Sequence, residues 1–259
     1  FLAVFGGSVL SAQMQDNRDK QMTCNNGRSE NRARHCDIRE LTLTGVGSLT
    51  IDGGRNGGAI VKGWLRNDVL VRAKIDVWAE TDAAAASLAG QIRVQTAAGQ
   101  VNASGPESPD HSGWAVSYEV FVPQNTNLNL KTHNGGISVS DVRGRLEFDA
   151  TNGGVRLTRV AGDVGGATVN GGLHVKLAGD RWDGRQLAVS TTNGGVTIEI
   201  PERYSAHIQT GTVNGGFHSD FPITVRGDLK PHAVDFDLGS GGPLIHVSTT
   251  NGGVTLKRL

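Results

Sequence analysis

The sequence predicts an all-β repeat fold, and three observations support this prediction. The tripeptide Asn-Gly-Gly recurs along the chain, apolar residues alternate with polar ones on both of its flanks, and a threonine stands two residues before most copies. A fixed recurrence indicates one copied unit that needs its neighbours to bury its apolar face. The copies begin at Asn134, Asn152, Asn170, Asn193, Asn214 and Asn251.

The spacing of the copies defines the length of the unit. The first two intervals are 18 residues each, the next two are 23 and 21, and the last, at 37 residues, is close to two units. Eighteen residues of extended chain at about 3.3 Å per residue make a closed turn with a perimeter of about 60 Å. One unit therefore fits one turn of a small coil.

The residues around each tripeptide predict two half-buried strands, because apolar and polar positions alternate with a period of two. Four residues before the asparagine the position is apolar in every copy except at Gly166 and Thr210. The threonine two residues before it suits a narrow inner corner, where its hydroxyl can bond to neighbouring backbone. Three residues after it the position is always apolar, with Ile137, Val155, Leu173, Val196, Phe217 and Val254.

Two arrangements of these strands remain open. Asn-Gly is a strong turn signal because both residues tolerate a positive φ, so each copy could be the tip of an antiparallel hairpin in a meander. Alternatively, each copy is a corner of a parallel β-solenoid, in which the six asparagines stack into a structural ladder. The constant period and a second repeated corner, at 142–144 and 160–162, favour the parallel solenoid.

Four segments are expected along the chain. Residues 1–12 are apolar and end in small residues, which is typical of a signal-peptide remnant or of an apolar N-terminal strand, and they are too short to span a membrane as a helix. Residues 13–37 are polar. Residues 38–131 form an irregular β region with a short helix at Thr81–Ala89 that would cap the solenoid. Residues 132–259 are the repeat region.

The polar segment contains both cysteines of the chain, Cys24 and Cys36. In an exported protein they would pair, and the short loop that they close would contribute about 3 kcal/mol of stability. The alternative is a zinc site that includes His35. Three candidate ligands without Cys-x-x-Cys spacing make a poor zinc site, so we expect no metal.

The charge balance limits the partners. Lys+Arg and Asp+Glu are equal at 25 each, which removes the general attraction to nucleic acids and anionic membranes. If the units stack in chain order, outward positions gather Arg156, His174 and Lys176 into a basic spot, with Glu199 and Asp220 beyond it. With His218, these residues form a candidate face for a cell-surface glycan or protein. We expect no catalytic residues and no cofactor.

Several runs of residues resemble a known family. These are Ser117-Tyr-Glu-Val-Phe-Val-Pro123, Thr132-His-Asn-Gly-Gly-Ile137 and the repeated Val-x-Gly and Thr-x-Asn-Gly-Gly-Val units. Together they resemble DUF4097-type bacterial β-strand-repeat proteins, which are labelled as candidate adhesins. The similarity covers about Cys24 to Leu259, and the segment from Cys24 to Glu40 resembles exported members. The resemblance implies a cell-envelope or secreted β-solenoid-like protein without an assigned reaction.

The sequence thus predicts an exported, non-catalytic, adhesin-like binding or scaffold module. An alternative is a subunit of an extracellular filament, a homopolymer in which the last repeat offers a free strand edge at Val254–Leu259 and the apolar Phe1–Leu10 of another subunit adds to it. A polysaccharide-processing β-helix enzyme is a third reading, and it needs an acidic or basic cleft.

Overall fold

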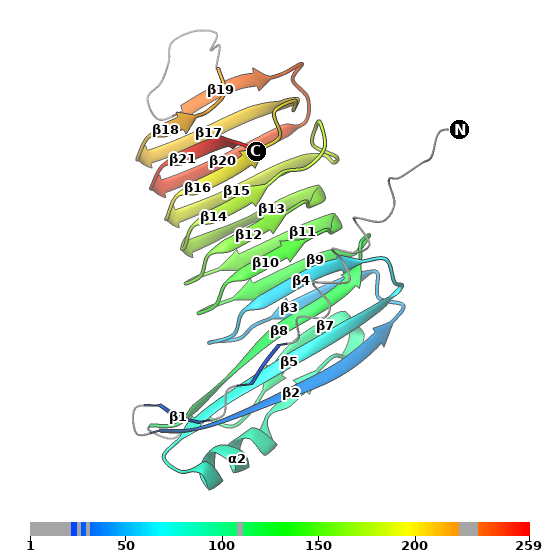
Figure 1. The fold of residues 1–259 in the computed structure, drawn as a ribbon, viewed down its shortest axis with the longest axis vertical. Helices are drawn as coiled ribbons and strands as arrows, with labels where there is room; N and C mark the ends of the chain where they lie inside the picture. Colours follow the sequence, from blue (N-terminus) through cyan, green and yellow to red (C-terminus); the bar gives the residue numbers. More distant parts are fainter. Residues whose placement is uncertain (1–21, 25–26, 30–31, 108–110, 223–232) are drawn as a thin grey trace, which may run out of the picture.

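The computed structural model describes residues 22–24, 27–29, 32–107, 111–222 and 233–259. The expected signal-peptide remnant or apolar strand at 1–12 lies outside these residues. The described residues are mostly in β-strands, and two sheets pack face to face in a long stack (Figure 1). Neither sheet closes into a barrel, and the all-β prediction with parallel strands is confirmed.

The two sheets of the described residues differ in strand order. The eleven-stranded sheet contains β1 (Gly27–Ser29), β2 (Arg32–Thr44), β5 (Asp68–Ala79), β8 (Gly113–Pro123), β4 (Ala59–Trp64), β10 (Ile137–Ser140), β12 (Val155–Thr158), β14 (Leu173–Lys176), β16 (Val196–Ile200), β21 (Val254–Arg258) and β18 (Phe217–Ser219). The ten-stranded sheet contains β19 (Ala233–Leu238), β17 (Ala206–Asn214), β20 (Leu244–Asn251), β15 (Gln186–Asn193), β13 (Ala161–Asn170), β11 (Arg143–Ala150), β9 (Asn127–Thr132), β3 (Ser48–Asp52), β7 (Gln100–Ser104) and β6 (Arg93–Gln95).

Each Asn-Gly-Gly unit links the two sheets. The strand before the tripeptide lies in the ten-stranded sheet and the strand after it lies in the eleven-stranded sheet. Strands of successive units pair in parallel, and Ile137 aligns with Val155 and Val155 with Leu173, in the register that the 18-residue period predicts. The hairpin alternative is therefore wrong for the repeat region. We call one such pair of strands with its turn a rung.

The asparagine side chains form a continuous ladder along one edge of the stack. Each Nδ2 donates to the Oδ1 of the next asparagine, for example Asn152 to Asn134 at 2.8 Å and Asn170 to Asn152 at 2.7 Å. The ladder begins at Asn56, since Asn134 donates to it at 3.0 Å. Asn56-Gly57-Gly58 is a further copy of the tripeptide, whereas the sequence analysis placed the first copy at Asn134.

The glycines of the turns are required for a different reason from the one that the sequence suggested. None of them is among the described residues with a positive φ. Instead, a Cβ on the first glycine would collide with the neighbouring rung, as at Gly153, where it would lie 2.2 Å from the carbonyl oxygen of Gly135. The close approach of backbones between rungs thus excludes any side chain at this position.

The predicted inner columns are confirmed, and the exception at Gly166 has a physical reason. Gly166 replaces an apolar residue because the Phe148 ring fills its place, and a Cβ there would lie 2.6 Å from the ring. The threonine hydroxyls bond to backbone as expected, with Thr168 donating to the carbonyl of Gly153 at 2.8 Å. Aliphatic side chains such as Val155 and Val189 fill the space between the sheets.

The last rung does not follow chain order. Strands β20 and β21, which carry Asn251, lie between the rung of Asn193 and the rung of Asn214. The 37-residue interval arises because β19 turns back antiparallel to β17 at the sheet edge before the chain returns. The filament reading needs a free edge at Val254–Leu259, and this expectation is wrong because β18 pairs with β21 there.

The other end of the stack is built from long antiparallel strands and one helix. The expected helix is present as α2 (Asp82–Gln91), which packs against β2 and β5, and Thr81 caps it by accepting from the backbone N–H of Ala84. A short 3-10 helix, η1 (Ala97–Gly99), follows β6. Figure 1 shows α2 at the end opposite to β19.

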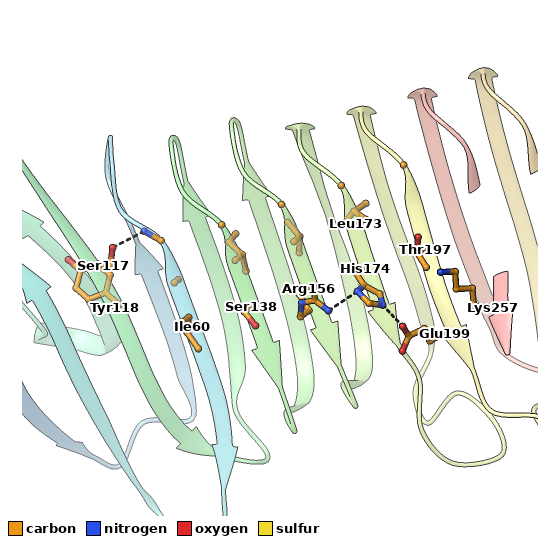
Figure 2. Close-up of a pocket in the computed structure, with 18 of the residues that line it drawn as sticks. Ile60, Ser117, Tyr118, Ser138, Arg156, Leu173, His174, Thr197, Glu199 and Lys257 are labelled. Carbon is orange, nitrogen blue, oxygen red and sulfur yellow. Dashed lines mark hydrogen bonds and ion pairs between the residues drawn. The ribbon is translucent and has the colours of Figure 1, made fainter. Parts of the chain in front are cut away.

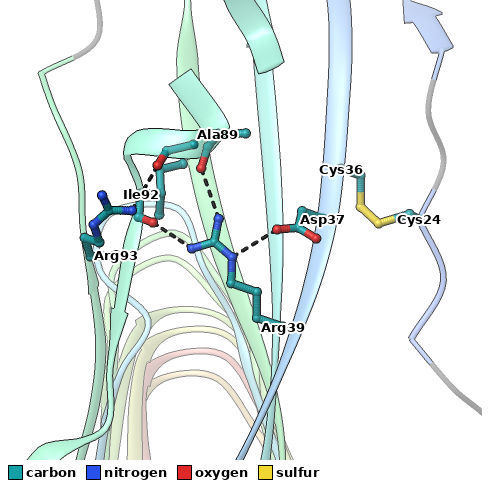
Figure 3. Close-up of polar contacts among 8 residues, drawn as sticks. Cys24, Cys36, Asp37, Arg39, Ala89, Ile92 and Arg93 are labelled. Carbon is teal, nitrogen blue, oxygen red and sulfur yellow. Dashed lines mark hydrogen bonds and ion pairs between the residues drawn. A yellow bond between two sulfur atoms is a disulfide. The ribbon is translucent and has the colours of Figure 1, made fainter. Parts of the chain in front are cut away.

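An arginine and a disulfide fix this end (Figure 3). The Arg39 guanidinium of β2 donates to the carbonyl of Ile92 at 2.7 Å and to that of Ala89 at 3.2 Å, which satisfies the carboxyl end of α2. Cys24 and Cys36 form a disulfide, with their Cα atoms 5.5 Å apart. The zinc alternative is therefore wrong, because both thiols are consumed.

Strand β9 pairs with β3 on one side and with β11 on the other, so the ten-stranded sheet continues across the expected division at 131 and 132. In the part of the chain that the structure describes, no helix is long and apolar enough to cross a membrane.

Candidate functional site

A shallow groove of about 740 Å³ crosses the outer surface of the eleven-stranded sheet (Figure 2). It runs from strand to strand rather than along any one of them, beside the Asn-Gly-Gly turns. Its floor follows the second glycine of successive copies, which lack a side chain to fill it. These are Gly58, Gly136, Gly154, Gly172 and Gly195.

The groove forms because the second glycine of each turn has no side chain to fill this space. A Cβ on Gly172 would lie 3.5 Å from the carbonyl oxygen of Gly195, an ordinary contact, whereas a Cβ on the adjacent Gly171 would lie 2.2 Å from the carbonyl oxygen of Gly153. The first glycine of each turn thus allows the rungs to stack. The second leaves open the surface next to them.

One row of outward side chains borders the groove. The strand register places Ser138, Arg156, His174 and Thr197 side by side on β10, β12, β14 and β16. Each residue of this row stands four residues after the asparagine of its repeat. At the other end of the groove stand Ile60, a residue that is 41% exposed, and Ser117, whose hydroxyl accepts from the Gly58 N–H at 3.4 Å.

Three of the predicted face residues form a hydrogen-bonded chain. Arg156 Nη1 lies 2.7 Å from His174 Nδ1, and His174 Nε2 lies 2.8 Å from Glu199 Oε1. Because a guanidinium only donates, His174 Nδ1 must be the acceptor, and the imidazole carries its proton on Nε2 toward the carboxylate. The structure therefore assigns His174 as the neutral Nε2–H tautomer.

Glu199 also contacts Lys176, whose Nζ lies 3.7 Å from Glu199 Oε2. Partial burial acts to raise the pKa of Glu199, but the hydrogen bond from His174 and the charge of Lys176 outweigh it, and the net pKa is lowered. The Glu199 carboxylate is therefore ionised, and Lys176 and the hydrogen bond from His174 compensate its negative charge.

The order of the rungs corrects the predicted pattern of charge. Glu199 lies directly against His174 and Lys176, so these residues do not form an isolated basic spot. Next to Glu199 comes Lys257 of β21, in place of the expected Asp220, because the last rung is inserted there. His218 lies on β18, beyond Thr255, and pairs with Asp220 at 3.4 Å. It is separate from the Arg156–His174–Glu199 chain.

Sequence reasoning missed Lys257, Ile60 and Ser117 as groove residues. Lys257 stands six residues after Asn251, in the same column as Lys176 and Glu199, but its place in the stack depends on the inserted last rung. Ile60 stands four residues after Asn56, so the first Asn-Gly-Gly copy would have revealed it. Among the described residues, no group of His, Cys, Asp and Glu side chains is arranged to hold a metal ion.

The arrangement defines a class: a repeat protein of two stacked sheets with parallel pairing in its repeat half. Residues 81–257 match the family model described as Toastrack DUF4097, which is more than half of the chain. The chain belongs to this family. None of the curated proteins matches it.

Several solved structures are similar to the chain. A candidate cell adhesion protein from Clostridium sporogenes ATCC 15579 is 14% identical, with 87% of this chain and 100% of that chain covered and a TM-score of 0.45. A candidate adhesin from Bacteroides fragilis NCTC 9343 is 11% identical, with 87% and 97% covered and a TM-score of 0.36. A candidate lipid binding protein from Parabacteroides distasonis ATCC 8503 is 10% identical, with 85% and 96% covered and a TM-score of 0.38.

Proposed function

We propose that the protein is an exported, non-catalytic surface module that makes adhesin-like contacts with a cell-surface partner through the groove. In this proposal the repeat region is a β-solenoid whose asparagine ladder keeps the outer face rigid. The Cys24–Cys36 disulfide supports an extracellular or envelope location, because such bonds persist in oxidising compartments.

The observation that carries the proposal is the continuity of the groove across five second-glycine positions. Neighbouring strands lie about 4.8 Å apart, so four spacings extend over about 19 Å. A surface of this length, bordered by hydroxyl and charged side chains on rigid strands, fits an extended partner better than a small substrate. Both ring nitrogens of His174 are already bonded, to Arg156 and Glu199, which does not favour a role as a general base.

Matched tryptophan variants test this location. Ser138→Trp would place an indole in the row that borders the groove, and Ser190→Trp would place the same group on the outer face of the ten-stranded sheet, where Ser190 is also half-buried. We expect the first variant to reduce binding of the purified protein to isolated envelopes of the source cells by at least about tenfold, which corresponds to about 1.4 kcal/mol, and the second to retain binding. Equal binding by both variants would reject the groove as the contact surface.

A further inference from the structure

We propose that the ligand of the groove is an extended acidic glycan, whose carboxylates pair with Arg156 and Lys257. This inference rests on the proposed function and gives it a ligand class. It starts from an imbalance of charge in the groove. Among the described residues, Arg156 contacts His174 but no carboxylate, and Lys257 has neither an ion pair nor a hydrogen bond.

Two other arginines of the repeat region, unlike Arg156, have a carboxylate partner. Arg159 pairs with Asp141 through two bonds of 2.7 Å, and Arg145 bonds to Glu147. Arg156 and Lys257 thus keep unneutralised positive charge at the groove. Glu199 lies between their strands, but Lys176 and the hydrogen bond from His174 compensate its charge, so it does not cancel the attraction for an anion.

The positions of the two cations require a long ligand. Strands β12, β14, β16 and β21 are consecutive in the sheet, so Arg156 and Lys257 are three strand spacings apart across the sheet, about 14 Å, and two residues apart along the strand direction. One carboxylate cannot reach both. A polymer with repeated carboxylates can place one at each cation while its hydroxyl groups meet Ser138 and Thr197 along the groove.

The backbone of the floor disfavours a peptide strand as the occupant. Its hydrogen-bonding groups are already used between rungs, with the Val155 N–H donating to the carbonyl of Gly172 at 2.9 Å and the Leu173 N–H to that of Gly195 at 3.0 Å. Strand addition depends on a free backbone edge, which the middle of this sheet does not offer. Recognition must therefore come from side chains, and those that border the groove include the hydroxyl groups of Ser138 and Thr197, the guanidinium of Arg156 and the ammonium of Lys257.

The test uses polygalacturonate, a linear glycan with a carboxylate on each unit, and dextran, which is neutral. We expect the whole chain to bind polygalacturonate more tightly at low salt than at high salt, and not to bind dextran. Arg156→Gln and Lys257→Gln should each weaken this binding about tenfold. Arg145→Gln, on the outer face of the other sheet, should leave it unchanged.

Two outcomes would overturn the inference: equal binding of both polymers, or unchanged polygalacturonate binding by Arg156→Gln and Lys257→Gln. Thermal melting of each variant checks that it is folded. The result is distinct from a failure of the proposed function. If Ser138→Trp abolishes envelope binding but polygalacturonate does not bind, the contact surface stands and the acidic-glycan assignment fails. If polygalacturonate binds but Ser138→Trp leaves envelope binding unchanged, the proposed contact surface fails.

Discussion

The two ends of this stack are held together by different means. At the α2 end, β2, β5 and β8 are 13, 12 and 11 residues long, and large side chains connect them. Arg72 bonds to Glu40 at 2.6 Å and to Glu119 at 3.3 Å, and Lys62 bonds to Glu119 at 2.7 Å. In the repeat half, β10, β12 and β14 have four residues each, and stability depends on backbone contact between rungs.

This difference shows which residues determine the structure of each half. At the α2 end the interactions come from side chains that reach across strands, and a conservative replacement can preserve part of them. In the repeat half the interactions between rungs come from close backbone contacts, which a glycine without a side chain allows, and from one asparagine amide per rung. Replacements of equal size should therefore have very different costs, depending on which glycine or asparagine they affect.

The largest expected effect comes from the first glycine of an interior turn. Gly171→Ala places a methyl group 2.2 Å from the carbonyl oxygen of Gly153, which forces the rungs apart, and we expect a loss of about 4 kcal/mol in the free energy of unfolding. Gly172→Ala is the matched control in the same turn, with its Cβ 3.5 Å from the nearest heavy atom, and should cost less than about 1 kcal/mol. Urea unfolding of both variants measures the difference. Similar losses would contradict the view that contact between rungs sets the cost.

The second-largest expected effect concerns the disulfide at the α2 end. Replacing Cys24 and Cys36 together by serine should cost about 3 kcal/mol, because the disulfide restricts the unfolded chain. Amide hydrogen exchange should show the loss of protection concentrated in β2 and α2, with the ladder rungs changed less. A uniform loss over both halves would mean that they unfold as one unit, and the comparison between them would lose its basis.

An intermediate effect tests the asparagine ladder. Asn152→Ala removes two hydrogen bonds, one to Asn134 and one from Asn170, while Asn214→Ala removes only the bond to Asn251 at the end of the ladder. We expect losses of about 2 and about 1 kcal/mol, since one such bond contributes roughly 0.5–1.5 kcal/mol. Thermal unfolding of the two variants under one condition provides the comparison. A larger loss for the end residue would show that the ladder is not additive.

The repeat half was largely predictable, because its signal is local. The alternation around each asparagine defined the strands, and the 18-residue period defined the register of Ile137 with Val155. The position of the last rung was not predictable. The residues next to Asn251 in the sequence do not indicate that β20 inserts beside β15. That position depends on β19 turning back against β17.

The same contrast applies to the groove. Arg156, His174 and Glu199 follow from the repeat columns, whereas the neighbour of Glu199 depends on strand order and was predicted incorrectly. The role of the glycines was also hidden from the sequence. A turn that needs a positive φ and a stack that needs close backbones both select glycine, and only the distance between rungs distinguishes the two causes.

The smallest effect concerns charge on the repeat face. The pKa of Glu199 is lowered from its ordinary value of 4.5, so the ionised carboxylate stabilises the folded state. This contribution is present above about pH 4.5. It is lost as the pH falls through the lower pKa of the folded state, because the unfolded chain binds the proton at a higher pH than the folded protein does. The pair is partly exposed, with 24% of the Glu199 side chain accessible, so the contribution should stay below about 1 kcal/mol.

Unfolding of the wild type and of Glu199→Gln in urea, at pH values from about 3 to about 6, measures this contribution. We expect the difference in the free energy of unfolding to be largest above about pH 5 and to shrink toward about pH 3. A difference that stays constant over this range would show that the carboxylate acts through packing rather than charge. A difference as large as that of Gly171→Ala would mean that side chains on the outer face stabilise the rungs as strongly as backbone contact does, which is the pattern of the α2 end.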